Sequence, residues 1–294
     1  MRLKIVFAGL TFSLLARIPV WPNSTADFLL GNVDARTHSL GGAVAGDANG
    51  YSTFSRNPSS LSTSSSTSFS SSAGIRPDGS KNLQFSFTKN IKGQNAGLHV
   101  FNSFYQSETI LDDIGNPGGE FKNSDLSILF ALGREIKSLR FGISTVLVRK
   151  SLADISAHGA SVTGSIQVPV HRRFTFGAML NDVTLFPISF DGSSELFPSQ
   201  ARAGTSFRVI DRDNFTIDFL SDLVNSSDQG LHYELGSELN LNSSFFVRGG
   251  ISSMSEGGRI GLGMWFERFR LEWSMQFSPL GSRDFMNFTM GYKF

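Results

Sequence analysis

The sequence of 294 residues contains no cysteine and has a formal net charge of only +1. The absence of cysteine excludes a disulfide framework, a thiolate metal site and a lipid-modified N-terminal cysteine. The balanced charge gives no sign of a nucleic-acid-binding surface. After the first two dozen residues, no apolar run reaches the roughly 18 residues that a membrane-spanning helix needs. A helical membrane protein is therefore excluded, whereas a β-barrel is not, because its apolar residues alternate with polar ones.

The N-terminus has the pattern of a secretory signal. Arg2 and Lys4 precede an apolar stretch over residues 5–16, and small residues at 24–26 offer a cleavage site. Arg17 interrupts the apolar stretch, which argues against the alternative of a retained anchor helix. We therefore expect residues 1–26 to be a signal peptide that is removed on export.

The rest of the chain is rich in phenylalanine (28 residues) and glycine (30 residues), and most of it alternates between apolar and polar residues. A period of two predicts β-strands, and no sustained helical period competes with it. About fourteen such runs have the roughly 9–11 residues that cross a bilayer at a tilt. They centre near Ser70, Phe85, Leu98, Leu129, Ile143, Gly164, Phe176, Gly204, Ile217, Leu235, Val247, Leu262, Trp273 and Thr289. The predicted fold is all-β: an antiparallel transmembrane barrel of about fourteen strands over residues 65–294.

The lengths of the connections between these runs support a barrel. Every second connection is tight, whereas the long ones, over residues 103–122 and 182–198, fall in the other set. Outer-membrane barrels have short turns on the periplasmic side and longer loops outside. We therefore predict a bacterial outer-membrane location, with membrane lipid as the surroundings of the barrel.

The chain ends on an aromatic residue, as barrels of this class commonly do. Tyr292 and Phe294 lie on the apolar face of the last run. The last strand must be a lipid-compatible edge until it pairs with the first strand. We predict that these two residues form the signal that the barrel assembly machinery recognises.

Residues 27–64 lack clean alternation and precede the first strand. A lumen fourteen strands wide is too broad to be filled by wall side chains alone, so a plug is expected there. This segment resembles the N-terminal signature of the PorV/PorQ family, whose barrels are related to the fatty-acid transporter FadL. The resemblance lies in residues 34–36, 40–43, 46–50 and 54–61, although Ser59-Ser60 and Arg56 depart from the usual pattern.

The resemblance implies a FadL-like fold in which the segment forms a plug, or hatch, near the periplasmic end of the lumen. The motif residues that it assigns to the plug are Arg36, Gly41, Gly42, Asp47, Asn57 and Pro58. Pro58 fixes its own φ and an Asn side chain caps local backbone groups. We expect Asn57 to satisfy the backbone of the plug rather than to bind a ligand.

Charged residues lie on the strand faces opposite the apolar band. They are Arg202, Arg208, Asp218, His232, Glu234, Arg248, Arg259, Arg270 and Glu272. Burying them in a dry core would cost several kcal/mol each unless they were paired. A wet lumen removes that cost. We expect ladders of mixed charge that hold plug and wall together, in preference to a selective ion path.

Catalytic signatures are lacking. The five histidines (38, 99, 158, 171 and 232) show no metal-ligand spacing. A barrel lipase would need a histidine near a serine nucleophile, and His99 with Ser103 is the nearest candidate. We expect neither an enzyme nor a cofactor.

Three functions are compatible with these observations. The first is a channel for small hydrophobic molecules with the plug as its gate. The second, implied by the PorV/PorQ resemblance, is an accessory component of type IX secretion that binds exported proteins. The third is a structural barrel without cargo. An apolar pocket with an opening would favour the channel, whereas long ordered outer loops would favour the secretion partner.

Overall fold

The computed structural model describes residues 26–31, 34–76, 78–111, 117–153, 155–190, 192–255, 257–277 and 285–294. Of the predicted signal peptide, residues 1–25 lie outside the described residues. Within the described ranges, no helix is long and apolar enough to cross a membrane.

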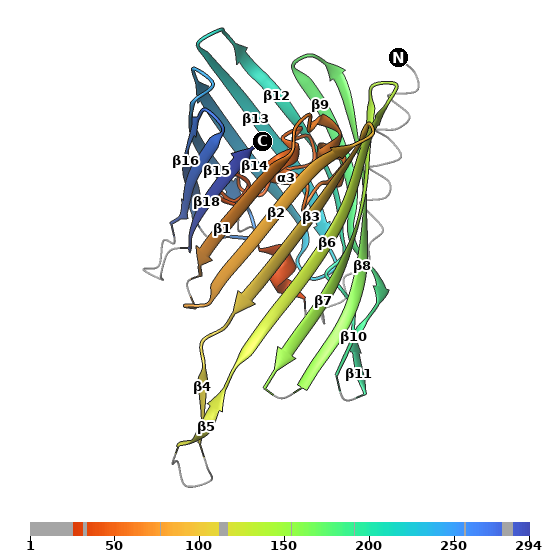
Figure 1. Ribbon diagram of the computed structural model, residues 1–294, viewed down its shortest axis with the longest axis vertical. Coiled ribbons are helices and arrows are strands. Elements are labelled where there is room, and N and C mark those ends of the chain that lie inside the picture. The colour runs from red at the N-terminus through yellow and green to blue at the C-terminus, as the bar shows by residue number, and fades with distance from the viewer. Residues whose placement is uncertain are drawn as a thin grey trace.

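Fourteen strands close into one antiparallel barrel, which confirms the predicted fold class (Figure 1). The barrel strands are β1 (Ser68–Ile75), β2 (Lys81–Ile91), β3 (Gln94–Phe104), β6 (Asn123–Ile136), β7 (Leu139–Leu152), β8 (Ile155–His171), β9 (Phe174–Phe186), β12 (Gln200–Asp211), β13 (Phe215–Ser226), β14 (Gly230–Leu241), β15 (Phe245–Ser252), β16 (Gly258–Phe266), β17 (Phe269–Gln276) and β18 (Phe285–Lys293). Each of the fourteen predicted centres lies inside one of them.

The alternation along each strand separates an apolar outer surface from the lumen. In β18, Met286, Phe288 and Met290 are 45–52% exposed on the outside, whereas Asn287 and Thr289 are at most 1% exposed inside. The barrel closes where β1 pairs with β18 over eight residues. Exposed apolar side chains on a closed sheet suit hydrocarbon rather than water.

The connections at one end of the barrel are all short turns, whereas the two long connections lie at the other end (Figure 1). The long connections contain two small hairpins that the sequence pattern did not predict. They are β4 (Glu108–Leu111) with β5 (Pro117–Phe121), and β10 (Ile188–Phe190) with β11 (Ser193–Glu195). Their strands are only three to five residues long, too short for alternation to reveal.

The N-terminal segment folds into short helices that pack inside the barrel. They are η1 (Asp27–Leu30), α2 (Ala35–Ser39), α3 (Gly50–Thr53) and η2 (Pro58–Thr63). Helix α2 contacts β15–β18, and η2 contacts β3 and β6–β8 on the opposite side. The segment therefore bridges the width of the lumen.

The lumen has two chemically different sides. Next to β3, β6 and β7, buried apolar residues of the wall, including Phe101, Leu129 and Val146, pack with Phe28, Phe54 and Leu61 of the N-terminal segment. Next to β12–β17, the interior instead holds buried charged residues. The N-terminal segment therefore meets hydrophobic contacts on one side and ion pairs on the other.

Candidate functional site

Arg36 connects helix α2 to the barrel wall. Its Nε and Nη2 donate to Glu238 of β14 at 2.9 and 3.2 Å, and its Nη1 pairs with Asp47 of the same segment. Burial works to lower the pKa of this guanidinium, but Asp47 and Glu238 outweigh it and raise the pKa well above its usual value. Arg36 is therefore a permanent cation that ties two parts of the segment to one strand.

A second cluster surrounds Arg202 of β12. Its Nη1 lies 3.0 Å from Asp222 of β13, pairs with Glu234 of β14, and donates to the carbonyl of Gly42 at 3.0 Å. The same Asp222 carboxylate accepts from the backbone amides of Val44 and Ala45 at 2.9 and 3.0 Å. One ion cluster thus holds the backbone of the N-terminal segment at residues 42–45.

A third cluster lies on β15 and β17. Arg248 pairs with Glu238 and lies 2.9 Å from Glu272, and Arg270 lies 3.5 Å from the same Glu272. Arg270 also approaches Asp34 at 3.7 Å, and its guanidinium lies 4.6 Å from the centre of the Tyr51 ring. Glu272 thus lies between two arginines, one on β15 and one on its own strand.

The remaining predicted lumen charges lie nearer the ends of the barrel. Arg208 and Asp218 form a bidentate pair at 2.7 and 3.0 Å near the tight turns. His232 lies 4.0 Å from Glu234. Arg259 donates to Gln276 at 3.0 Å and contacts none of the three clusters by a hydrogen bond or ion pair within the described ranges.

The predicted plug motif lies at close approaches between the segment and the wall. Gly41 and Gly42 have φ angles of +73° and +97°. A side chain on Gly41 would meet the carbonyl oxygens of Leu235 and Ile251 at 2.6 and 2.5 Å. Asn57 donates to the carbonyls of Val44 and Ala45 at 2.9 and 3.0 Å, and Pro58 begins η2. These contacts hold the backbone of the segment in place and allow it to lie close to the wall.

The two C-terminal aromatic residues lie on the outer surface at the tight-turn end. The Tyr292 ring packs against Phe269 and Phe294 at 4.9 Å between ring centres. The amide of Phe294 donates to the carbonyl of Thr67 at 3.0 Å, so the end of the chain also joins the start of β1.

Sequence reasoning missed two central acids, Asp222 and Glu238. Each lies four residues after an acid that was singled out, Asp218 on β13 and Glu234 on β14. Residues four apart on a strand share a face, so extending the same period by two steps would have found both.

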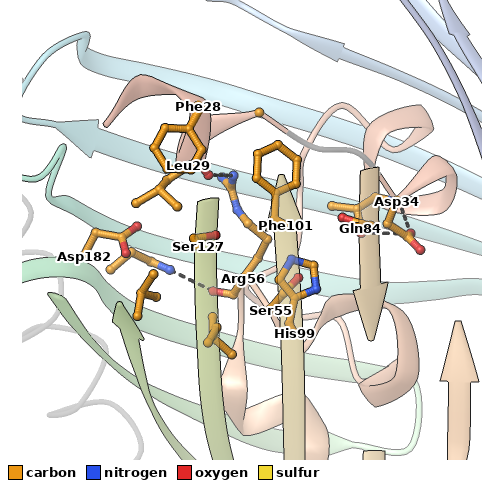
Figure 2. A pocket seen from close by; sticks show the side chains of 15 residues that line it. Phe28, Leu29, Asp34, Ser55, Arg56, Gln84, His99, Phe101, Ser127 and Asp182 are labelled. Atoms are coloured by element: carbon orange, nitrogen blue, oxygen red, sulfur yellow. Dashed lines mark hydrogen bonds between the residues drawn. The ribbon is translucent and has the colours of Figure 1, made fainter. Parts of the chain in front are cut away.

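A cavity of about 60 Å³ lies between the N-terminal segment and the apolar side of the wall (Figure 2). Phe28 and Phe101 stack along it at 5.8 Å, and Leu129 and Val146 line the wall. Arg56 reaches across it and donates to the carbonyl of Leu29 at 3.2 Å. Burial lowers the pKa of this guanidinium to about 10. The cavity thus has an aromatic and aliphatic side, while most of its other lining residues, such as Arg56 and Asp182, are polar or charged.

The wall is irregular next to this cavity. The pairing of β8 and β9 shifts between Val162 and Gly164, where Asp182 has a φ of +52°. Asn181 and Asp182 line the cavity inside. On the opposite surface, mostly small and aliphatic side chains of β8, β9 and β12, together with Ser165 and Arg202, surround a hollow of about 460 Å³. The bulge therefore separates an inner cavity from an outer apolar hollow.

Two larger, polar cavities occupy the ends of the lumen, with about 350 Å³ at the long-loop end and 480 Å³ at the tight-turn end. His38 of α2 lines the first, and Arg36 of the same helix lines the second. Burial, followed by the charge of Arg259, lowers the pKa of His38 to about 3, so this imidazole is neutral near pH 7. Helix α2 thus stands between the two cavities.

No family model matches the sequence, and no curated protein matches it significantly. Solved structures do match. The toluene transporter TbuX of Ralstonia pickettii superposes with a TM-score of 0.64 at 14% identity, covering 90% of this chain and 98% of the transporter. This chain has a FadL-like fold. The toluene transporter TodX of Pseudomonas putida gives 0.65 at 12% identity over 94% and 99% of the two chains. A FadL homologue of Pseudomonas aeruginosa gives 0.54 at 9% identity over 94% and 99%.

The histidines of the FadL-like barrel do not form a catalytic group with the serine considered above. His99 contacts Ser86 at 2.9 Å, and Ser103 donates to Asn82 at 2.8 Å, so His99 and Ser103 have different partners. Among the described residues, no group of three or more His, Asp and Glu side chains could hold a metal ion. The matched structures named above as transporters are channels rather than enzymes.

Proposed function

We propose that this protein is an outer-membrane channel for small hydrophobic molecules, with monoaromatic hydrocarbons such as toluene as candidate substrates. The observation that carries the proposal is the apolar hollow outside the β8–β9 bulge, which lies opposite an inner cavity with one aromatic and aliphatic side. A hydrophobic solute that leaves through the wall avoids the polar cavities at the ends of the lumen. The toluene transporters with the same fold support this substrate class.

The proposal includes a location and a route of assembly. Residues 1–26 would direct export, residues 27–64 would form the plug, and residues 65–294 would form the barrel. Tyr292 and Phe294 would be recognised by the assembly machinery. The exposed apolar band around the barrel supports contact with membrane lipid.

Substitution in the outer hollow tests the route through the wall. Gly164 faces outward beside Ile143 and Leu180, and a side chain there would meet no atom within 4 Å. Gly164→Trp should therefore fill the hollow and lower uptake of labelled toluene by cells that carry the barrel. Gly258→Trp is the matched control, because Gly258 of β16 has equally open space. Equal uptake by the two variants would reject the wall route.

A disulfide between the plug and the wall tests gating. A Cβ built on Gly261 would lie 2.5 Å from the Cβ of Ser39, so a small shift reaches the separation of about 3.8 Å found in disulfides. Because the chain has no other cysteine, Ser39→Cys with Gly261→Cys gives a single defined link. Uptake should stop on oxidation and return on reduction. Unchanged uptake by the oxidised protein would mean that this part of the plug need not move.

A second candidate is an accessory role in type IX secretion within the PorV/PorQ family. The N-terminal resemblance and the β4–β5 hairpin, which projects beyond the long-loop end of the barrel (Figure 1), favour it. Replacing residues 108–121 with a short glycine linker should then abolish secretion of exported proteins and leave toluene uptake intact. The opposite pattern would favour the channel.

A further inference from the structure

The tight-turn end of the barrel is strongly basic. Residues 89–94, 134–140, 171–173, 208–214, 266–269 and 291–294 contain eleven Lys and Arg against four Asp and Glu. The whole chain has a net charge of only +1, so the excess at this end is local. Such an excess attracts anions unless neighbouring acids neutralise it.

Two of these cations face the membrane rather than the lumen. Lys89 of β2 is exposed and shares its face with Phe87 and Ile91, which are 38% and 53% exposed. Arg134 of β6 is exposed and shares its face with Leu132 and Ile136, which are 45% and 49% exposed. A cation on the lipid-facing surface is costly in the middle of a bilayer and is tolerated near its boundary. The boundary of the membrane therefore passes close to both residues.

The two cations lie close together on the wall, because β2, β3 and β6 are side by side (Figure 1). Lys89 is opposite Ala96 of β3, and Gly133, the residue before Arg134, is opposite Asn95. Two strand spacings amount to about 10 Å, which long side chains can span. On this face of β3, the small Ala96 and the exposed Gln94 lie between them.

Two further lysines, Lys92 and Lys137, lie in the adjoining turns. We define the basic patch as Lys89, Lys92, Arg134 and Lys137. The nearest acid in the sequence, Glu135, lies on the lumen side and pairs with Arg140 at 3.3 Å. Across the described ranges, none of the four patch cations forms an ion pair with another side chain. Four neighbouring cations thus lack a protein anion.

We propose that this basic patch binds the headgroup of an anionic phospholipid in the leaflet that surrounds the tight turns. Cations flanked by exposed apolar side chains match a lipid, whose phosphate and acyl chains lie next to each other. Each Lys or Arg near an anionic membrane surface strengthens binding about fivefold. The inference rests on the proposed location in the outer membrane, but not on the transported substrate.

Native mass spectrometry of the full chain in detergent tests the proposal, with phosphatidylglycerol and phosphatidylcholine of equal acyl length as probes. The variant Lys89→Gln with Arg134→Gln should bind phosphatidylglycerol about 25-fold more weakly than the native chain. Binding of phosphatidylcholine should not change. The matched control, Lys81→Gln with Lys122→Gln, removes the same charge at the long-loop end of the barrel and should bind both lipids normally.

Three results would overturn the proposal. They are equal loss of phosphatidylglycerol in both variants, no preference of the native chain for phosphatidylglycerol, and displacement of the lipid by equimolar inorganic phosphate or polyglutamate. A difference in gel migration between unheated and heated samples of each variant verifies that the barrel is folded. Toluene uptake is measured separately, so failure of transport and failure of lipid binding can be distinguished.

Discussion

Removal of the Arg36 side chain should release the N-terminal segment from the charged side of the lumen. The side chains of Arg36, Asp47 and Glu238 are only 4–8% exposed, so the change leaves two buried carboxylates with fewer partners. Breaking a buried pair costs about 3–5 kcal/mol. Glu238 keeps Arg248, and Asp47 keeps the hydroxyl of Thr53 at 3.2 Å, which places the cost at the low end. A loss of about 3 kcal/mol shifts the docking equilibrium roughly 100-fold toward the released form.

Conductance of single barrels in planar bilayers measures this release. Arg36→Ala should open to small ions far more often than the native chain, and its segment should become sensitive to protease. Arg208→Ala is the control, because Arg208 pairs with the wall residues Asp218 and Asp211 instead of the segment. The combination of Arg36→Met with Glu238→Gln should recover part of the closed state. Native conductance and protease resistance in Arg36→Ala would refute the proposed anchoring role.

Three further outcomes are expected. The pKa of His38 is lowered to about 3 in the docked segment and is about 6.5 in the released segment. Between these pH values the docked form binds fewer protons than the released form. Docking should therefore weaken by about 2 kcal/mol from pH 7 to pH 5. His38→Asn should abolish the accompanying rise in conductance, and a persisting rise would assign it to other groups. Gly177→Val should displace the N-terminal segment, because a side chain at this position clashes with the carbonyl of Ala45. Gly164→Val should leave the segment docked, because a side chain there meets no atom. Equal protease sensitivity of the two variants would contradict this prediction. Ser138→Gly should stabilise the barrel by about 1 kcal/mol in urea unfolding, because Ser138 has a φ of +67°, which favours glycine. A lower urea concentration at the unfolding midpoint would show that the turn is not strained.

The strand pattern of this protein could be predicted from sequence because membrane and lumen impose opposite demands on alternate residues. In β17, for example, Leu271 is 39% exposed and Glu272 is 2% exposed, a contrast that the sequence displays directly. The short β4–β5 and β10–β11 hairpins are not strands of the barrel wall, so the alternation between outer surface and lumen does not extend along them. Sequence alternation therefore does not distinguish these strands from loops.

The partners of the charged residues could not be predicted in the same way. That Arg202 faces the lumen follows from alternation, but its contact with Glu234 depends on the register of β12, β13 and β14 together. Its contact with Gly42 depends on the path of a segment without strand periodicity. The cavity beside Arg56 and the bulge at Asp182 likewise arise from packing and register, which single-sequence periods do not contain.

The unlike sides of the lumen predict where the proposed movement of the plug would begin. Ion pairs and hydrogen bonds require fixed positions and angles, so the attachment near β12–β17 resists small displacements. Contacts among Phe28, Leu61, Phe101 and Leu129 have no such angular requirement, and a hydrocarbon solute can replace them with similar contacts. The first gap should therefore form along β3, β6 and β7, and the charged side should separate afterwards, which is the step that a disulfide between residues 39 and 261 would block.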